Sequence, residues 1–286
     1  MGNIRGHRYR ALRPTVAALV TVACGGGSPL LHPAQPLPPG VTSLSAGVGS
    51  QWVGGRANRE VEDANNAAAS GRGPQSLASA PSVAAAIYAP GLFPWVSMRL
   101  GLKYETETGV SYTGHRARID ARHAWLKGPW AFSVGAGAGL GLAHPAASNP
   151  NGTLLGASEP ISGLDTSGTH AVAFDVPLLV GWRSSADVAR LWLGLRQTYE
   201  HVYGTLSYTQ TASPSRSELS ANVLTTSGIL GLAMGLRPLY IAMELSVGAG
   251  FAHGSLSATS GGLAGGSASL SAITFTPATA LIWEMR

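Results

Sequence analysis

The chain has 286 residues, of which 45% are hydrophobic and only 12% are charged. A typical soluble domain carries about 25% charged residues, so the composition argues against an ordinary soluble protein. The longest apolar run, Thr15–Ala23, is much shorter than the roughly 20 residues that a membrane helix needs. A membrane protein without spanning helices has one remaining architecture, the closed β-barrel, because lipid offers no partner to an unpaired backbone group.

The net charge of +5 and the pI of about 9.7 come mainly from the N-terminus. Arg5, Arg8, Arg10 and Arg13 are the only charged residues before Cys24. Without these four, 15 basic residues face 14 acidic ones, and the net charge falls to +1. A nucleic-acid-binding domain needs a clustered basic surface, so we expect no nucleic-acid partner.

Residues 1–23 have the layout of a signal peptide. The four arginines precede a short apolar segment, and the small residue Ala23 stands directly before Cys24, the only cysteine. This order is typical of an exported protein, and the segment is too short to span a membrane. The stretch 21–25, Thr-Val-Ala-Cys-Gly, resembles a bacterial lipobox, although Thr21 stands where that class usually has leucine. The resemblance implies cleavage before Cys24 and a diacylglyceryl group on its sulfur, with ordinary cleavage nearby as the alternative.

Residues 24–40 separate the signal peptide from the predicted barrel, residues 41–286. This segment contains five prolines and begins with a run of glycines after Cys24. Proline-rich chains are semi-extended, at about 3 Å per residue. We therefore predict that residues 24–40 form a periplasmic tether between a lipid anchor and the first strand.

Alternation of apolar residues with small or polar ones predicts the strands. It is almost unbroken in four segments, 96–105, 130–142, 172–183 and 239–251, and no charge occurs at their apolar positions. Weaker strands are predicted at Thr42–Gly54, Pro81–Ala89, Val110–Trp125, Arg190–Leu206, Leu219–Leu236 and Ser269–Met285. The expected fold class is therefore all-β, a single antiparallel up-and-down transmembrane barrel of about 10 strands, with 8 or 12 as alternatives.

The connections of this predicted barrel resemble those of Gram-negative outer-membrane barrels, which have short periplasmic turns and long extracellular loops. The resemblance implies an outer-membrane location with both termini periplasmic and the long loops extracellular. Aromatic residues are expected at the two membrane–water boundaries, with Tyr104 at the outer one. A break in alternation after Tyr112 predicts a bulge near Gly114. The predicted aromatic girdle comprises Trp52, Tyr104, Trp125, Trp130, Trp182, Tyr199, Phe251 and Trp283.

The inward positions are mostly glycine, alanine and serine, interrupted by charges of both signs. Buried charges cost several kcal/mol unless they are paired, so we predict a self-neutralising network that fills a narrow lumen. A narrow conducting path is the alternative. An inward glycine such as Gly137 is expected to tolerate serine. The predicted lumen network comprises Arg99, Lys103, Arg116, Arg118, Asp120, Arg122, Asp175, Arg196, Glu200 and Glu244.

No spacing typical of a catalytic or metal site stands out. A ten-stranded outer-membrane barrel resembles the omptin proteases in outline, but no Asp-x-Asp occurs and Glu200-His201 is the only adjacent acid–histidine pair. His253-Gly-Ser255 resembles the His-x-Ser element of outer-membrane lipid A deacylases over two common residues. The eight histidines show no His-x-His or Glu-x-x-His spacing. We expect no metal, no cofactor and no catalytic residue.

The sequence thus predicts an outer-membrane barrel lipoprotein that is not an enzyme and serves as a structural or interaction component of the cell envelope. The expected partners are outer-membrane lipids and lipopolysaccharide, together with envelope proteins reached through the long outer loops. Two other functions remain open at this point, a narrow channel for small solutes or ions and, third, a lipid-modifying hydrolase at the rim.

The lipobox resemblance predicts that Cys24 carries a lipid. Growth with labelled palmitate should label the wild-type protein, and Cys24→Ala should lose the label while the barrel still inserts. Labelling that survives the substitution would contradict lipid attachment at Cys24.

Overall fold

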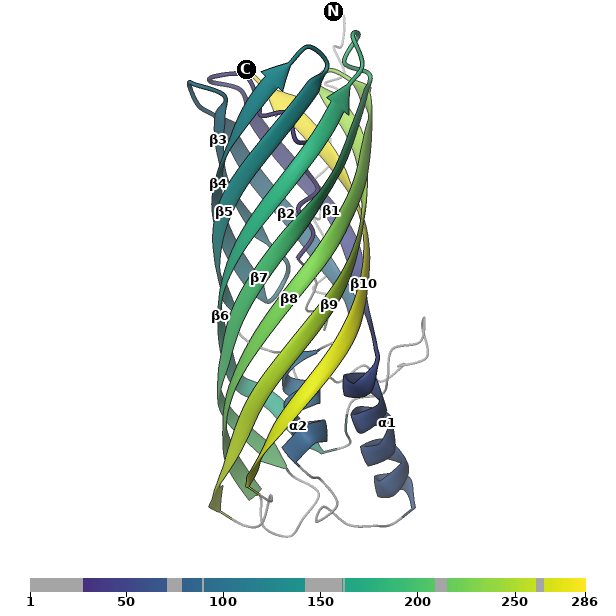
Figure 1. Ribbon diagram of the computed structural model, residues 1–286, viewed down its shortest axis with the longest axis vertical. Helices are drawn as coiled ribbons and strands as arrows, with labels where there is room; N and C mark the ends of the chain where they lie inside the picture. Colours follow the sequence, from purple (N-terminus) through teal and green to yellow (C-terminus); the bar gives the residue numbers. More distant parts are fainter. Residues whose placement is uncertain are drawn as a thin grey trace, which may run out of the picture.

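The computed structural model describes residues 28–70, 79–88, 90–141, 161, 163–208, 215–260 and 265–286. Its ten strands pair in sequence order and antiparallel, and β10 pairs with β1 to close the barrel (Figure 1). This confirms the predicted all-β, up-and-down barrel. The strands are β1 Thr42–Gly54, β2 Gly91–Gly101, β3 Thr106–Tyr112, β4 Arg116–Lys127, β5 Trp130–Gly141, β6 Leu164–Arg183, β7 Ala189–Tyr208, β8 Ser215–Leu236, β9 Leu239–Ser260 and β10 Gly266–Met285.

The end of the barrel where β1 begins and β10 finishes is here called the termini end. The opposite end is called the far end. Thr42 of β1 pairs with Met285 of β10 at the termini end. Strands β6–β10 have 20 to 22 residues each, whereas β1–β5 have 7 to 13. The long strands therefore continue past the short ones at the far end, beside two helices, α1 Arg56–Ala69 and α2 Ser79–Ile87 (Figure 1). No helix in the described part of the chain is long and apolar enough to cross a membrane.

Two strand predictions are wrong and offset each other. The segment predicted as the strand Pro81–Ala89 lies largely in α2, because its near-continuous run of alanine, valine and isoleucine has no period that separates a strand from a buried helix. The predicted strand Val110–Trp125 instead comprises parts of β3 and β4. The break in alternation near Gly114, whose φ of +84° suits glycine, is a turn between them and not a bulge.

These corrections reverse the direction of β2. Because β1 ends at the far end and both helices lie there, the chain begins β2 at the far end and runs to the termini end. The following turn at residues 102–105 therefore lies at the termini end. Tyr104 in this turn is 82% exposed. Tyr104 thus lies at the opposite end of the barrel from Trp52, and the prediction that placed both residues at the outer boundary is wrong.

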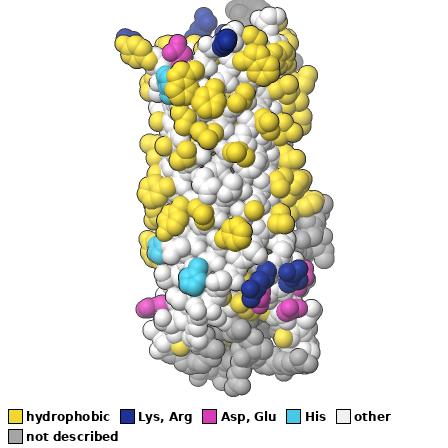
Figure 2. Space-filling view, in the orientation of Figure 1, with side chains coloured by type: hydrophobic (Ala, Val, Ile, Leu, Met, Phe, Trp, Pro, Cys, Tyr) yellow, Lys and Arg dark blue, Asp and Glu magenta, His cyan; other side chains and the backbone are white. Residues whose placement is uncertain are grey.

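An apolar belt covers the outer surface of the barrel (Figure 2). Every second side chain points outward, and the exposed ones include Leu230, Ile241 and Met243. Along β9 the outward apolar side chains extend from Leu239 to Phe251. At about 3.3 Å per residue and a tilt of about 40°, this stretch spans roughly 30 Å along the barrel axis. Of the predicted aromatic girdle, the outward and exposed members on strands are Trp52, Trp125, Trp130, Tyr199, Phe251 and Trp283, and Trp182 is partly buried.

Beyond Phe251 the polarity of the two faces is inverted. On β9 the outward residue His253 is polar and exposed, whereas the inward residues Ala252 and Leu256 are buried. On β10 the change falls between the outward residues Ile273 and Ser271. The far part of β6–β10 thus has the polar-out, apolar-in pattern of a sheet that faces water.

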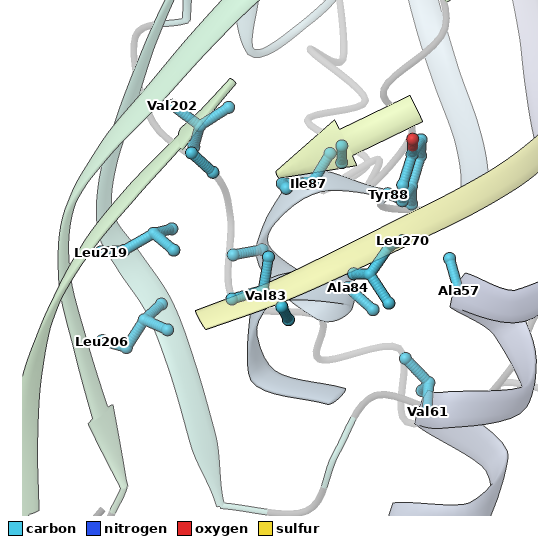
Figure 3. Close-up of a cluster of buried hydrophobic side chains, with 14 of the residues drawn as sticks. Ala57, Val61, Val83, Ala84, Ile87, Tyr88, Val202, Leu206, Leu219 and Leu270 are labelled. Atoms are coloured by element: carbon cyan, nitrogen blue, oxygen red, sulfur yellow. The ribbon is translucent and has the colours of Figure 1, made fainter. Parts of the chain in front are cut away.

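The apolar inner face of this far part packs against α2, and α1 packs beside α2 (Figure 3). Val83 of α2 is completely buried and belongs to the same cluster as Leu219 and Leu270. Val61 of α1 joins this cluster. The helices cover the side where β2–β5 end, so the far part of β6–β10 with α1 and α2 has its own small core, here called the far extension.

Candidate functional site

The lumen holds a segment of the chain itself, residues 28–40, here called the plug segment. Leu30, Leu31 and Ala34 are between 0% and 3% exposed. They belong to one apolar cluster with inward side chains from strands all around the barrel, among them Trp95 of β2 and Trp192 of β7. The segment therefore lies inside the barrel and is surrounded by its wall.

This position differs from the periplasmic tether predicted for residues 24–40. Residues 24–27, including Cys24, lie outside the described residues, but residues 28–38 are enclosed, and only Pro39 and Gly40 of the plug segment are exposed. The five prolines favour this placement physically, because each removes a backbone N–H that would need a partner away from water. The leucines supply apolar surface whose burial is favourable.

Glu244 of β9 holds the start of the plug segment. Its two carboxylate oxygens accept hydrogen bonds from the backbone N–H groups of Leu30 and Leu31, each at 2.8 Å. Trp192 Nε1 donates to the same carboxylate at 3.1 Å. Glu244 is thus satisfied by the plug and not by the arginine partner expected from its place in the predicted network.

Three further wall side chains bind the plug backbone. Arg122 donates to the carbonyl oxygens of Pro33 and Gln35, and Glu107 accepts a hydrogen bond of 2.8 Å from Leu37 N–H. Arg196 donates to the carbonyl oxygen of Ser28. Charge-assisted hydrogen bonds are about twice as strong as neutral ones, so these contacts fix the segment at several heights.

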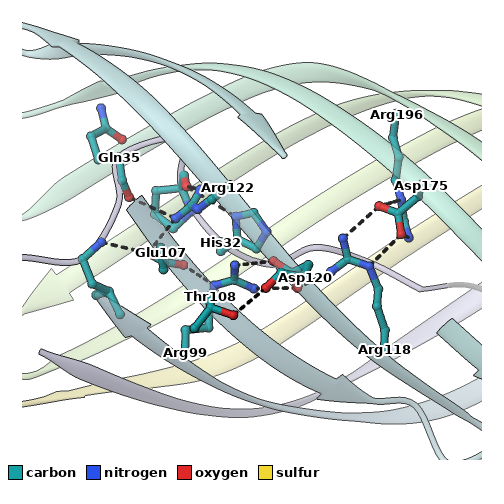
Figure 4. A network of polar contacts seen from close by, with 12 residues as sticks. His32, Gln35, Arg99, Glu107, Thr108, Arg118, Asp120, Arg122, Asp175 and Arg196 are labelled. Atoms are coloured by element: carbon teal, nitrogen blue, oxygen red, sulfur yellow. Dashed lines mark hydrogen bonds and ion pairs between the residues drawn. The ribbon is translucent and has the colours of Figure 1, made fainter. Parts of the chain in front are cut away.

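A continuous chain of ion pairs crosses the inner face of the barrel (Figure 4). Arg99 Nη2 lies 2.6 Å from Asp120 Oδ1, and Arg118 Nε lies 2.8 Å from Asp175 Oδ2. Each carboxylate of the chain contacts two arginines, as a buried carboxylate between guanidinium groups can. The members alternate in sign and are, in order, Arg122, Glu107, Arg99, Asp120, Arg118, Asp175 and Arg196.

Most residues of the predicted lumen network are brought together. Eight of them form ion pairs, because Arg116 and Glu200 make a separate pair beside the chain. Lys103 is an exception: it is exposed in the turn 102–105, since the strand that was expected to carry it ends at Gly101. The eight paired residues are Arg99, Arg116, Arg118, Asp120, Arg122, Asp175, Arg196 and Glu200.

Glu107 is the central carboxylate that the sequence analysis did not identify. It is completely buried and contacts Arg99, Arg122 and the plug. Its position lies between the predicted strands 96–105 and Val110–Trp125, so the alternation pattern assigns it to neither strand. The alternation of Glu107, Gly109 and Ser111 with Thr108 and Val110 was the available signal, since it places Glu107 on the inward side of β3.

Gly137 gives the ion-pair chain its space. A Cβ atom at this position would lie 2.5 Å from Arg118 Nη2 and 2.7 Å from Asp175 Oδ2. Any side chain there would press on this ion pair. The expected tolerance of Gly137→Ser therefore requires the ends of the Arg118 and Asp175 side chains to move.

A second cluster closes the termini end. Arg190 pairs with Glu284 of β10 and with Asp187 in the β6–β7 turn, and its guanidinium lies 4.2 Å from the centre of the Tyr240 ring. Arg237 in the β8–β9 turn lies 3.0 Å from Asp187. Burial opposes the charged form of Asp187, but the hydrogen bonds and charge of Arg190 outweigh it and lower the pKa of this carboxyl.

A polar cavity of about 100 Å³ lies between the plug segment and α2. Ser28 and Tyr88 line it, together with Arg196 and Glu200 from the wall. Hydroxyl groups form most of its remaining lining, which is contributed by Thr198, Thr225, Ser227, Ser246, Thr274 and Thr276. A cavity of this size and polarity suits a few water molecules.

The groups required by the hydrolase hypothesis are not assembled. Acyl transfer needs a nucleophile, a base and an orienting acid within hydrogen-bond reach. Glu200 pairs with Arg116 on the inside, whereas His253 points outward and contacts Ser269 at 3.0 Å. Among the described residues, no group of three or more histidine, cysteine or acidic side chains could hold a metal ion.

No known family model matches the sequence, and no curated protein is significantly similar to it. Solved structures give low-identity likenesses. A major outer membrane protein from Thermus thermophilus is 11% identical, with a TM-score of 0.38, over 85% of this chain and 99% of that one. Neisserial surface protein A is 10% identical, with a TM-score of 0.29, over 85% and 98%. The toluene transporter TodX of Pseudomonas putida is 10% identical, with a TM-score of 0.26, over 87% and 90%.

The ion-pair chain predicts a large cost for losing its central carboxylate. Glu107→Gln leaves Arg99 and Arg122 with one counter-charge fewer and should destabilise the barrel by about 3–5 kcal/mol. The shift should appear as a lower temperature of heat-modified migration in gels. Glu105→Gln, in the exposed turn two residues earlier, is the matched control and should behave like wild type. Equal unfolding temperatures for both variants would show that the chain does not stabilise the barrel.

Proposed function

We propose that this protein is a bacterial outer-membrane barrel whose lumen is filled by its own plug segment. The barrel would anchor the far extension at the cell surface. It would serve as a structural or interaction component of the envelope. The plug segment is the observation that carries this proposal, because it fills the lumen and is bound by Glu244, Glu107, Arg122 and Arg196.

The apolar belt supports a membrane location. A monomeric soluble protein rarely exposes a continuous apolar surface of more than a few hundred Å², whereas a transmembrane barrel needs an apolar band about 25 Å tall. The belt ends where the outward residues become polar, between Phe251 and His253 on β9. We place the far extension outside the cell and the termini end in the periplasm, because longer extracellular loops are the rule in such barrels.

The membrane location predicts a difference between two outward positions on β8. Leu230→Arg, within the belt, should cost roughly 2–4 kcal/mol near the bilayer centre and reduce insertion into lipid vesicles. Ser220→Arg, on the same face of the same strand but beyond the belt, should insert like wild type. If both variants insert equally well, the belt does not face lipid.

A gated conduit is the second candidate, and the nature of the plug contacts favours it. The plug segment is held by hydrogen bonds and apolar contacts, so it can leave without breaking a strand pair. Its departure would join the polar cavity at Ser28 to the space beside the ion-pair chain. Paired charges of both signs would then line a narrow polar path with little ion selectivity.

Conductance distinguishes the two candidates. Wild-type protein in planar bilayers should show almost no current, because the plug fills the lumen. Glu244→Gln removes the negative charge that holds two plug N–H groups and should cause brief openings. Deletion of residues 28–37 should give a lasting current. Steady current through the wild-type barrel would contradict a closed lumen and favour the channel.

Lipid attachment at Cys24 is also proposed, from the lipobox resemblance alone. Cys24 precedes Ser28 by four residues, which span at most about 14 Å, and Ser28 is bound to Arg196 inside the lumen. A lipid that must reach the bilayer and a plug that must stay in place therefore make opposite demands on this short stretch. A protein that is labelled at Cys24 should therefore have Ser28 released from Arg196, as in the open state of the gated conduit.

A further inference from the structure

Polar and aromatic side chains form a strip on the outer surface of the barrel, directly beyond the apolar belt. They point outward from neighbouring long strands, and none of them is fully buried. The strip, here called the ring strip, comprises His170 of β6, Tyr199, His201 and Tyr203 of β7, Asn222 of β8 and His253 of β9.

Strand register arranges this surface as parallel rows that grow more polar with distance from the belt. The last apolar row contains Phe174, Leu224 and Phe251, with Tyr199 between them. The next row runs from Val172 through His201 and Asn222 to His253, so it is polar on β7, β8 and β9 but apolar on β6. On β8 and β9 the change from an apolar to a polar side chain therefore takes place over one step of two residues.

The side chains of the ring strip hold one another in position. Asn222 Oδ1 accepts a hydrogen bond of 2.8 Å from Tyr199 and lies 2.9 Å from His201 Nδ1. The rings of His201 and Tyr203 are stacked with centroids 5.6 Å apart, and His170 lies 6.0 Å from Tyr203. Binding surfaces whose side chains are already ordered lose less conformational entropy when a ligand binds.

A groove of about 430 Å³ runs along the same boundary. Leu224 and Phe251 line it on the belt side, and Asn222, His253 and Ser269 line it on the polar side. Among the described residues that line it, only Arg56 is charged, and Arg56 already pairs with Glu60 at 3.2 Å. The groove thus combines an apolar edge with neutral donors and acceptors and has little charge for a phosphate.

From this arrangement we propose that the ring strip and its groove bind the uncharged sugars that extend beyond the phosphorylated, acylated sugars of a glycolipid in the surrounding leaflet. Sugar hydroxyls both donate and accept hydrogen bonds, as histidine, asparagine and tyrosine side chains do. The apolar faces of sugar rings pack on exposed aromatic rings, and amphipathic rings prefer this boundary. The acyl chains of the same lipid would lie against Leu224 and Phe251. The proposal rests on the proposed membrane location for the source of the ligand.

Native mass spectrometry of the purified full-length protein in detergent tests this site. The probes are lipopolysaccharide with its core sugars, the same material reduced to lipid A, and the free core oligosaccharide. Wild-type protein should retain the sugar-bearing lipid and the free oligosaccharide, and it should retain lipid A roughly tenfold less. Preference for lipid A, or equal retention of lipid A and the complete lipid, would overturn sugar recognition.

Matched tyrosine variants assign the binding to the strip. The double variant Tyr199→Leu with Tyr203→Leu should bind the free oligosaccharide roughly tenfold more weakly. Tyr104→Leu removes an exposed tyrosine at the termini end and should bind like wild type. Asn222→Ala is a second variant in case the double variant does not fold. If both folded strip variants bind like wild type, the proposal is wrong. Binding of the free oligosaccharide requires no membrane. Its absence would therefore contradict the binding site alone, whereas normal insertion of Leu230→Arg would contradict the membrane location.

Discussion

The structure depends on one constraint: polar groups enclosed by the barrel must find partners without bulk water. Arginines and carboxylates on the wall meet this constraint partly through each other, in the chain from Arg122 to Arg196. The backbone of the plug segment supplies further hydrogen-bond partners to Glu107, Arg122 and Glu244. The plug in turn needs these side chains, since its own N–H and C=O groups would otherwise be buried without partners. Wall and plug therefore stabilise each other.

The same constraint, applied to lipid around the belt and to water around the far extension, explains how polar and apolar residues are distributed. Within the belt the outside is apolar and the inside carries the charges. In the far extension the outside is polar, and the inside packs apolar residues such as Leu219 and Leu270 against α2. Five long strands can carry both patterns because each strand changes polarity at the same boundary. The ring strip lies where the two patterns meet, which is also where a lipid headgroup would be.

The barrel could be predicted from the sequence because alternation reports directly which face of a strand meets lipid. The prediction failed in segments that have no clear alternation of apolar and polar residues. Pro81–Ala89 is apolar at nearly every position, so its period could not identify α2. The strand predicted at Val110–Trp125 begins after Glu107, so the start of β3 and its inward carboxylate lay outside every predicted strand. The plug could not be found by periodicity at all. Residues 28–40 have the composition of a linker, and their burial depends on a lumen that exists only after ten strands have closed.

Hydrogen exchange of the plug amides tests the central claim most directly. In the barrel reconstituted in lipid, the N–H groups of Leu30, Leu31 and Leu37 should exchange as slowly as those of the strands, because carboxylates inside the lumen accept their hydrogen bonds. Glu244→Gln should accelerate exchange at Leu30 and Leu31 more than at Leu37. Exchange of all three amides at the rate of an unstructured peptide would contradict the account, since the lumen would then not be closed by this segment.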